Sequence, residues 1–243
     1  MISSVPMSSN NYSPTWFDTF LLGTAPGSTG NEMEFLLRKL PRPGYPRVLD
    51  LCCGTGRHSL LLAEVGYDVT GFDINPYALQ AARKQDSRGS IKFVQGDMRD
   101  LSSLDGEFDA VLNLWQSFGY FHEEENREVL RQVHNKLRQG GRFVLDIYNR
   151  AFFTAHQGTR TLQSGNRKII ETKYMTGDRL TVHLDYGHPI QPDNYEWQLY
   201  TPDNIRAACE EIGFRTVIGC SGFDESAPPA ETNPRMQFVF EKV

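Results

Sequence analysis

The 243-residue sequence lacks the usual signs of disulfide bonds and of metal sites. It has only four cysteines, and none of them forms a Cys-x-x-Cys pair. Cys52 and Cys53 are adjacent, which is a poor spacing for a disulfide or for two ligands of one metal ion. The six histidines form no His-x-x-x-His pair. We therefore expect reduced thiols, no bound metal and a cytoplasmic location.

Long apolar segments and dense basic segments are also missing. No run approaches the ~18 apolar residues of a membrane span, and residues 1–10 lack the basic and apolar parts of a signal peptide. Lysine and arginine number 25 against 30 aspartates and glutamates, so the formal net charge is −5. This balance, with no Lys/Arg run, argues against a dedicated nucleic-acid surface. The sequence thus predicts a soluble protein with neither nucleic acid nor membrane as a partner.

Strand and helix patterns alternate from residue 47 onward. Short apolar strands are expected at residues 48–51, 68–72, 91–94, 108–112 and 143–147. Helices are expected at residues 58–64 and 77–84, and along the stripe Leu130, Val133 and Leu137, which ends at Gly140 and Gly141. Such alternation predicts a parallel sheet with helices on both faces. Ligands bind these sheets beyond the carboxyl ends of the strands.

The flanking segments carry other patterns. Thr29 and Glu32 have the spacing of a capping box and predict a helix from Thr29 through Leu40. The apolar segment that begins at Trp16 is either a helix packed on the body or a lid over a pocket. In the carboxyl half, residues 168–186 predict an antiparallel hairpin, and residues 196–200 a further strand. Residues 201–212 predict a capped helix, and residues 214–219 and 237–241 the two last strands.

A glycine-rich turn follows the first expected strand, and acids follow three strands. Gly54 and Gly56 allow a ligand to approach the backbone closely. Asp50, Asp73 and Asp97 each lie at the carboxyl edge of neighbouring strands, so they can meet in one crevice. Carboxylates at these places suit an ammonium group, the ribose hydroxyls and the adenine amino group, which together describe S-adenosylmethionine. Taken singly, each acid could equally be a loop residue or a helix cap.

A nicotinamide dinucleotide is the alternative ligand for such a turn. Its fingerprint requires a third Gly or Ala where this sequence has Ser59. The acid at Asp97 also argues against it.

The five motifs in this region resemble those of the class I S-adenosylmethionine-dependent methyltransferases. Residues 50–56 are similar to the first motif, Asp-x-Gly-x-Gly-x-Gly, with Cys52 in place of its first glycine. Residues 71–75 match the ribose motif, and residues 95–98 match the adenine motif. Residues 108–114 match the fourth-strand motif, and residues 137–143 match the turn before the fifth strand. The resemblance covers about residues 45–150 motif by motif, and the last helix and strands more loosely.

The resemblance implies an α/β fold with a Rossmann-like seven-stranded sheet, mostly parallel with the last strand antiparallel, and an added antiparallel β segment. We expect a single domain over residues 1–243. Residues 1–28 are expected to form an N-terminal lid or arm, and residues 29–156 the cofactor-binding core. Residues 157–200 are expected to form a substrate-side antiparallel β extension, and residues 201–243 a C-terminal helix with strands.

The cofactor implied by the resemblance is S-adenosylmethionine, with S-adenosylhomocysteine as product. The residues expected to bind it are Trp16, Asp50, Cys52, Gly54, Gly56, Arg57, Asp73, Ile74, Asp97, Met98, Asn113 and Leu114. Arg57 could pair with the methionyl carboxylate or be a surface cation.

The acceptor side is less defined by the sequence. Residues 56–58 and 113–121 resemble a bacterial subgroup of small-molecule and peptide methyltransferases, which usually opens with a Trp-Phe segment like that at Trp16. Tyr120 and His122 are the candidate catalytic residues. Tyr120 could instead be a packed aromatic, and His122 a surface residue at a helix start. We expect a small-molecule or peptide acceptor that is methylated on nitrogen or oxygen, with nitrogen favoured over oxygen.

Two other functions stay open at this point. One is a nicotinamide-dependent oxidoreductase on a similar sheet. The other is a non-catalytic subunit that retains the cofactor fold. The oligomeric state is also open.

Overall fold

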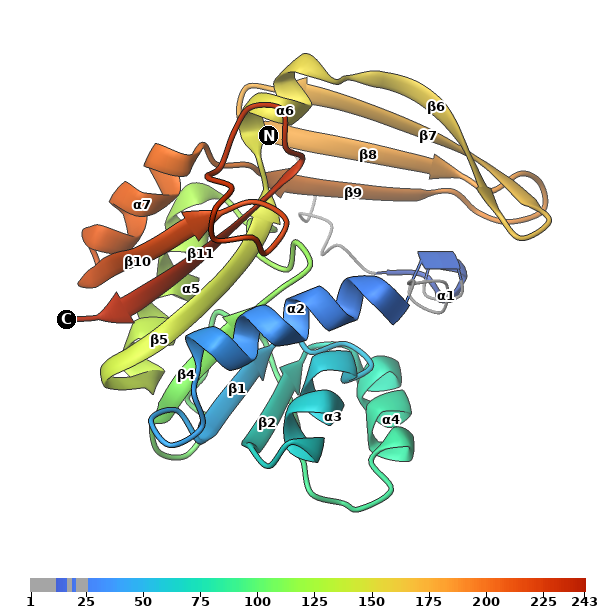
Figure 1. The fold of residues 1–243 in the computed structure, drawn as a ribbon. Helices are drawn as coiled ribbons and strands as arrows, with labels where there is room; N and C mark the ends of the chain where they lie inside the picture. Colours follow the sequence, from blue (N-terminus) through green and yellow to red (C-terminus); the bar gives the residue numbers. More distant parts are fainter. Residues whose placement is uncertain (1–11, 17–18, 21–25) are drawn as a thin grey trace, which may run out of the picture.

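The computed structural model describes residues 12–16, 19–20 and 26–243. Seven strands form its central sheet: β1 (Arg47–Leu51), β2 (Asp68–Asp73), β3 (Lys92–Gln95), β4 (Phe108–Asn113), β5 (Leu137–Tyr148), β10 (Phe214–Cys220) and β11 (Arg235–Lys242). The strand order is β10-β11-β5-β4-β1-β2-β3 (Figure 1). β1 to β5 pair in parallel, whereas β11 is antiparallel to both β5 and β10. The predicted sheet is therefore confirmed.

Helices cover both faces of this sheet because its strand residues alternate between two apolar cores. The helices are α1 (Pro14–Trp16), α2 (Pro26–Lys39), α3 (Arg57–Glu64), α4 (Pro76–Gln85), α5 (Glu123–Lys136), α6 (Arg150–Ala155) and α7 (Pro202–Glu210). Val48 belongs to the core that includes Phe35 of α2 and Leu62 of α3. Leu49, on the opposite face, belongs to the core formed with α5 and α7. The sheet is thus the middle layer of three.

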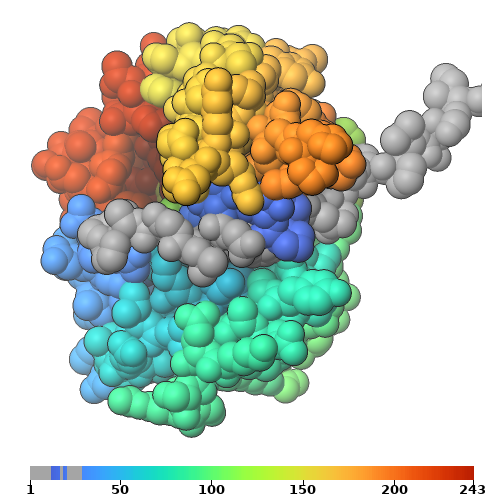
Figure 2. Space-filling model, turned by 90° about the vertical axis from the view of Figure 1, so that its right-hand side faces the viewer, coloured from blue at the N-terminus to red at the C-terminus, as the bar shows by residue number. Residues whose placement is uncertain are grey.

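A second sheet has four antiparallel strands in the order β6-β7-β8-β9. Its strands are β6 (Gly158–Ser164), β7 (Arg167–Thr176), β8 (Arg179–Asp185) and β9 (Asp193–Gln198). The predicted hairpin is confirmed, with Gly177 at φ 65° in its two-residue turn. Figure 2 shows this sheet, in yellow and orange, stacked over the blue and green core, with described residues of the N-terminal arm between them.

Two local predictions are wrong, and one strand was not predicted individually. Helix α2 begins at Pro26, so Thr29 lies inside the helix and does not cap it. Helix α5 ends at Lys136, and Leu137 opens β5 because Leu137 pairs with Phe108 of β4. β6 lies in the expected antiparallel extension of residues 157–200, but no strand was assigned to it because Gly158–Ser164 is polar and mostly exposed. It becomes a strand through its antiparallel pairing with β7.

In the part of the chain that the structure describes, no helix is both long and apolar enough to cross a membrane.

Candidate functional site

The turn after β1 brings the three predicted acids around one thiol. Cys52 begins this turn at φ 63°, a left-handed conformation, and its Sγ lies 3.5 Å from Met98 Sδ. Burial raises the pKa of the Cys52 thiol well above its usual value. The charges of Asp73, Asp50 and Asp97 raise it further. All three carboxylates therefore lie close enough to act on the same atom, as the ends of adjacent parallel strands require.

Asp50 is a buried carboxylate and Asp73 is a partly buried one, and the groups that donate to them are neutral. Asp50 is 3% exposed and accepts a hydrogen bond from Ser59 Oγ at 2.5 Å. Asp73 accepts the backbone N–H groups of Gly54 and Asn75, each at 2.8 Å. Burial is the main cause that raises the pKa of both carboxyl groups. Such groups gain stability from a ligand that brings hydroxyl or ammonium donors.

The Asp97 carboxylate already has a cationic partner. It accepts from the Arg99 guanidinium at 2.6 and 3.1 Å, and Arg99 also pairs with Glu125 at 2.6 Å. Burial alone would raise the pKa of Asp97, but the hydrogen bonds and charge of Arg99 lower it overall. Asp97 is therefore an acceptor held in a fixed orientation at the rim of the turn.

Apolar and amide groups complete this part of the site. Ile74, directly after Asp73, is 58% exposed, so its apolar surface is available to a ligand. An added Cβ at Gly54 would meet no atom within 4 Å, so the turn borders open space. Asn113 is fully buried, and no donor in the described residues reaches its Oδ1. Leu114, which follows it, is also buried.

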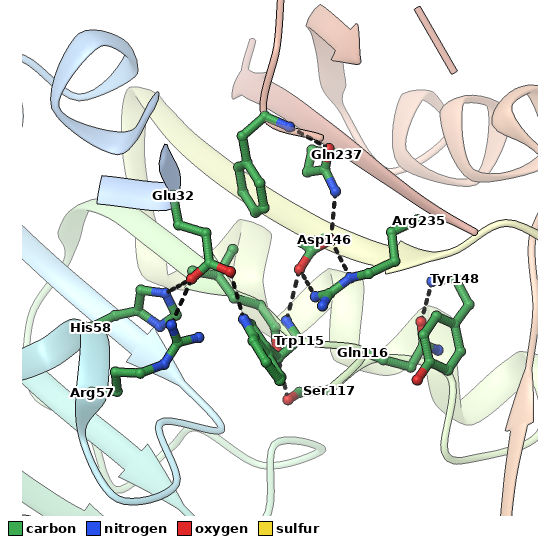
Figure 3. Close-up of polar contacts among 12 residues, drawn as sticks. Glu32, Arg57, His58, Trp115, Gln116, Ser117, Asp146, Tyr148, Arg235 and Gln237 are labelled. Atoms are coloured by element: carbon green, nitrogen blue, oxygen red, sulfur yellow. Dashed lines mark hydrogen bonds and ion pairs between the residues drawn. The ribbon is translucent and has the colours of Figure 1, made fainter. Parts of the chain in front are cut away.

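Arg57 is bound by residues that were not among the predicted site residues (Figure 3). Its Nη1 lies 2.9 Å from Glu32 Oε2 and also donates to Thr29 Oγ1. The guanidinium carbon lies 4.6 Å from the ring centroid of Trp115. Glu32 was assigned to a capping box, but it precedes Phe35 and Leu36 by three and four residues, on the buried stripe of α2. An acid on an apolar stripe was the signal that could have identified it.

The predicted acceptor-side residues separate into two environments. Tyr120 lies in an aromatic cluster beneath the antiparallel sheet, and its hydroxyl is 2.6 Å from the hydroxyl of Tyr12. Tyr12 stacks on Tyr195 of β9 at 4.8 Å, and the predicted cofactor contact Trp16 lies beside Tyr12 in the same cluster. His122 is exposed at the N-cap position of α5.

Titration and metal binding constrain what these groups can do. Burial raises the pKa of Tyr12 and of Tyr120, so both phenols remain protonated near neutral pH. Within residues 12–16, 19–20 and 26–243, no group of three or more His, Cys, Asp or Glu side chains is placed to hold a metal ion.

The predicted lid at residues 1–28 lies partly outside the described residues, so only its segments 12–16, 19–20 and 26–28 can be placed.

Comparisons with known proteins agree with this arrangement. A family model described as a methyltransferase domain matches residues 48–141. The putative methyltransferase YqeM of Bacillus subtilis is 38% identical over 86% of this chain and 88% of its own length. The glycine/sarcosine N-methyltransferase of Aphanothece halophytica is 29% identical over 82% of this chain and 77% of its own length. S-adenosylmethionine-bound CalS10, an amino pentose methyltransferase from Micromonospora echinaspora, has a TM-score of 0.71 at 20% identity, covering 97% of this chain and 100% of that chain.

Proposed function

Because the chain belongs to the class I S-adenosylmethionine-dependent methyltransferases, we propose that it methylates the nitrogen of a small-molecule amine. The family assignment replaces the nicotinamide-dependent and non-catalytic alternatives. The choice of nitrogen depends on one observation, the paired hydroxyls of Tyr12 and Tyr120. Their raised pKa values make both phenols poor general bases, and a hydroxyl acceptor would need a base. A neutral amine needs none.

The phenols suit an amine in two further ways. Their oxygens can accept N–H donors, which orients the nitrogen lone pair. Burial among aromatic rings disfavours the ammonium form and so lowers the pKa of a bound amine. The glycine/sarcosine N-methyltransferase relative supports an amine acceptor. The role predicted for His122 is less favoured, because that side chain is exposed at the helix start.

The residues around the turn fit S-adenosylmethionine by their chemistry. Asp73 would accept the ribose hydroxyls, and Ile74 and Met98 would contact the adenine, with Asp97 near its amino group. Asp50 would face the ammonium group, and Arg57 the methionyl carboxylate. The orphaned Asn113 Oδ1 offers one more acceptor. When bound, this cofactor supplies a methyl group activated by a sulfonium charge.

We also propose roles for the flanking parts. Residues 29–156 would bind the cofactor, while residues 157–200 and the arm in residues 1–28 would enclose the acceptor, since Tyr12 and Tyr195 meet there. Residues 201–243 would complete the sheet. A cytoplasmic location is consistent with the four free thiols of Cys52, Cys53, Cys209 and Cys220.

The test combines methyl transfer with a matched variant. Radiolabelled S-adenosylmethionine would be incubated with the protein and with panels of amines, amino sugars, hydroxyl compounds and peptides. We expect label to enter amines, and we expect Tyr12→Phe to reduce turnover at least tenfold while S-adenosylhomocysteine binds with unchanged affinity. Tyr174→Phe, at an exposed tyrosine of β7, is the control. Label that enters only hydroxyl compounds would contradict the proposal.

A further inference from the structure

Glu32 connects helix α2 to the glycine-rich turn after β1 and to the turn after β4. It is 3% exposed, although it is a carboxylate. Its Oε2 lies 2.9 Å from Arg57 Nη1 and 2.7 Å from His58 Nε2, and its Oε1 accepts Trp115 Nε1–H at 2.8 Å (Figure 3). Arg57 and His58 open α3 directly after the glycine-rich turn, whereas Trp115 follows β4. One side chain thus joins three elements.

The Trp115 ring also lies between two arginines. Arg57 and Arg235 approach its centroid to 4.6 and 5.0 Å, and Figure 3 shows them on either side of the indole. Each guanidinium is paired with a carboxylate, Arg57 with Glu32 and Arg235 with Asp146. These contacts fix the plane of the indole, and the indole in turn limits where the Arg57 guanidinium can lie.

The backbone beneath Trp115 needs such support. Trp115 and Gln116 have φ values of 60° and 59°, which non-glycine residues rarely adopt. Asp146 accepts the Trp115 N–H at 3.0 Å through its side chain and the Gln116 N–H at 3.1 Å through its carbonyl. The next residue, Ser117, accepts the Cys52 thiol through its carbonyl oxygen. The turn after β4 therefore contacts the glycine-rich turn through Ser117 and Cys52, and it contacts Glu32 through Trp115.

We infer that Glu32 is a positioning residue for the amino-acid end of the cofactor. It orients Arg57, which lies close to Asp50. The charge of Arg57 lowers the pKa of the Asp50 carboxyl, against the larger and opposite effect of burial. A zwitterionic amino-acid group would then meet one cation and one anion held at fixed places. This inference rests on the role proposed above for Arg57 and Asp50. It adds that a residue of α2, outside the segment matched by the family model, controls that role.

The experiment compares two ligands that differ only at the amino-acid end. S-adenosylhomocysteine carries that end, and 5′-methylthioadenosine lacks it. Calorimetric titration of the full-length protein with each ligand would be done for wild type, Glu32→Gln and Glu34→Gln. Glu34 is exposed on the same helix, so its variant makes the same charge change away from the site.

We expect Glu32→Gln to weaken S-adenosylhomocysteine about tenfold and to leave 5′-methylthioadenosine unchanged, while Glu34→Gln changes neither. A purely structural role would weaken both ligands together. Equal loss for both ligands, or loss for neither, overturns the inference. Wild-type protein that binds neither ligand would instead contradict the cofactor assignment itself.

A second variant covers the case in which Glu32→Gln unfolds. Trp115→Phe removes the indole N–H but retains a ring and the Glu32–Arg57 pair. A smaller loss, about threefold, is expected for S-adenosylhomocysteine alone. An unchanged affinity for S-adenosylhomocysteine in this variant, or a parallel loss for 5′-methylthioadenosine, counts against the inference.

Discussion

Both carboxylate oxygens of Asp73 accept backbone N–H groups, which fix the orientation of the side chain. Because the side chain is part of the turn and not a mobile surface group, its loss removes acceptors that are already oriented. We expect Asp73→Ala to weaken binding of S-adenosylhomocysteine by about 1–3 kcal/mol, the usual range for the loss of hydrogen bonds to a charged group. Calorimetry measures this, with Asp105→Ala as control at a fully solvated aspartate. Unchanged affinity would exclude Asp73 from the ribose role.

Asp50 and Asp73 also predict a pH dependence of binding. Burial raises the pKa of both carboxyls above the ordinary aspartate value of about 3.9. The ionised forms accept hydrogen bonds from the ligand, so affinity is full at neutral pH and falls as the pH drops through the raised pKa values. S-adenosylhomocysteine should therefore begin to dissociate at a pH above 3.9, while the protein is still folded. Titrations at decreasing pH, with circular dichroism as the folding control, check this; affinity that stays flat down to pH 4 would contradict it.

At the scale of elements, the loop after β4 stores backbone strain. The left-handed conformations of Trp115 and Gln116 cost about 1–3 kcal/mol each. Two hydrogen bonds offset this cost: the Asp146 carboxylate accepts the Trp115 N–H, and the Gln116 side chain accepts the Tyr148 N–H. Strain that is maintained by several partners is typical of functional loops.

The same loop docks on the antiparallel sheet at Gly119. Gly119 has φ 97°, its carbonyl accepts the Gln198 N–H at 2.7 Å, and an added Cβ would lie 2.4 Å from the Gln198 carbonyl oxygen. We expect Gly119→Ala to lower the free energy of unfolding by about 2–4 kcal/mol, from backbone strain and steric overlap. Gly177→Ala is the control, because Gly177 also has positive φ but borders open space. Urea unfolding compares them, and equal losses would show that the contact with Gln198 is unimportant.

Element boundaries show where sequence patterns mislead. Thr29 and Glu32 have capping-box spacing, but Thr29 lies inside α2 and Glu32 reaches Arg57, His58 and Trp115. A local pattern cannot distinguish a carboxylate that turns back to its own helix from one that reaches a neighbour. The cap of the helix that begins after Thr201 was predicted correctly, because its donor, the N–H of Asn204, is only three residues along the chain.

At the scale of the whole molecule, the N-terminal arm is bound to the antiparallel sheet through Asp193. This carboxylate accepts Ser13 Oγ at 2.6 Å and the Tyr186 hydroxyl at 2.7 Å. We expect Asp193→Ala to favour release of the arm by about 1–3 kcal/mol, because both donors lose a charged acceptor. Limited proteolysis should then cleave the N-terminus faster, while the midpoint of global unfolding changes little. Asp203→Ala, at an exposed aspartate of α7, is the control; equal cleavage rates would contradict this docking.

The sequence alone determined the sheet, its carboxyl-edge acids and the cofactor class, because each depends on short-range spacing and on the rule that parallel strands end at one edge. The tertiary structure decided which distant groups meet: Tyr12 with Tyr120, Glu32 with Trp115, and Ser13 with Asp193. These pairs are 83 to 180 residues apart in the chain. No periodicity encodes such contacts, since they arise only when separate helices and sheets pack and exclude water between them.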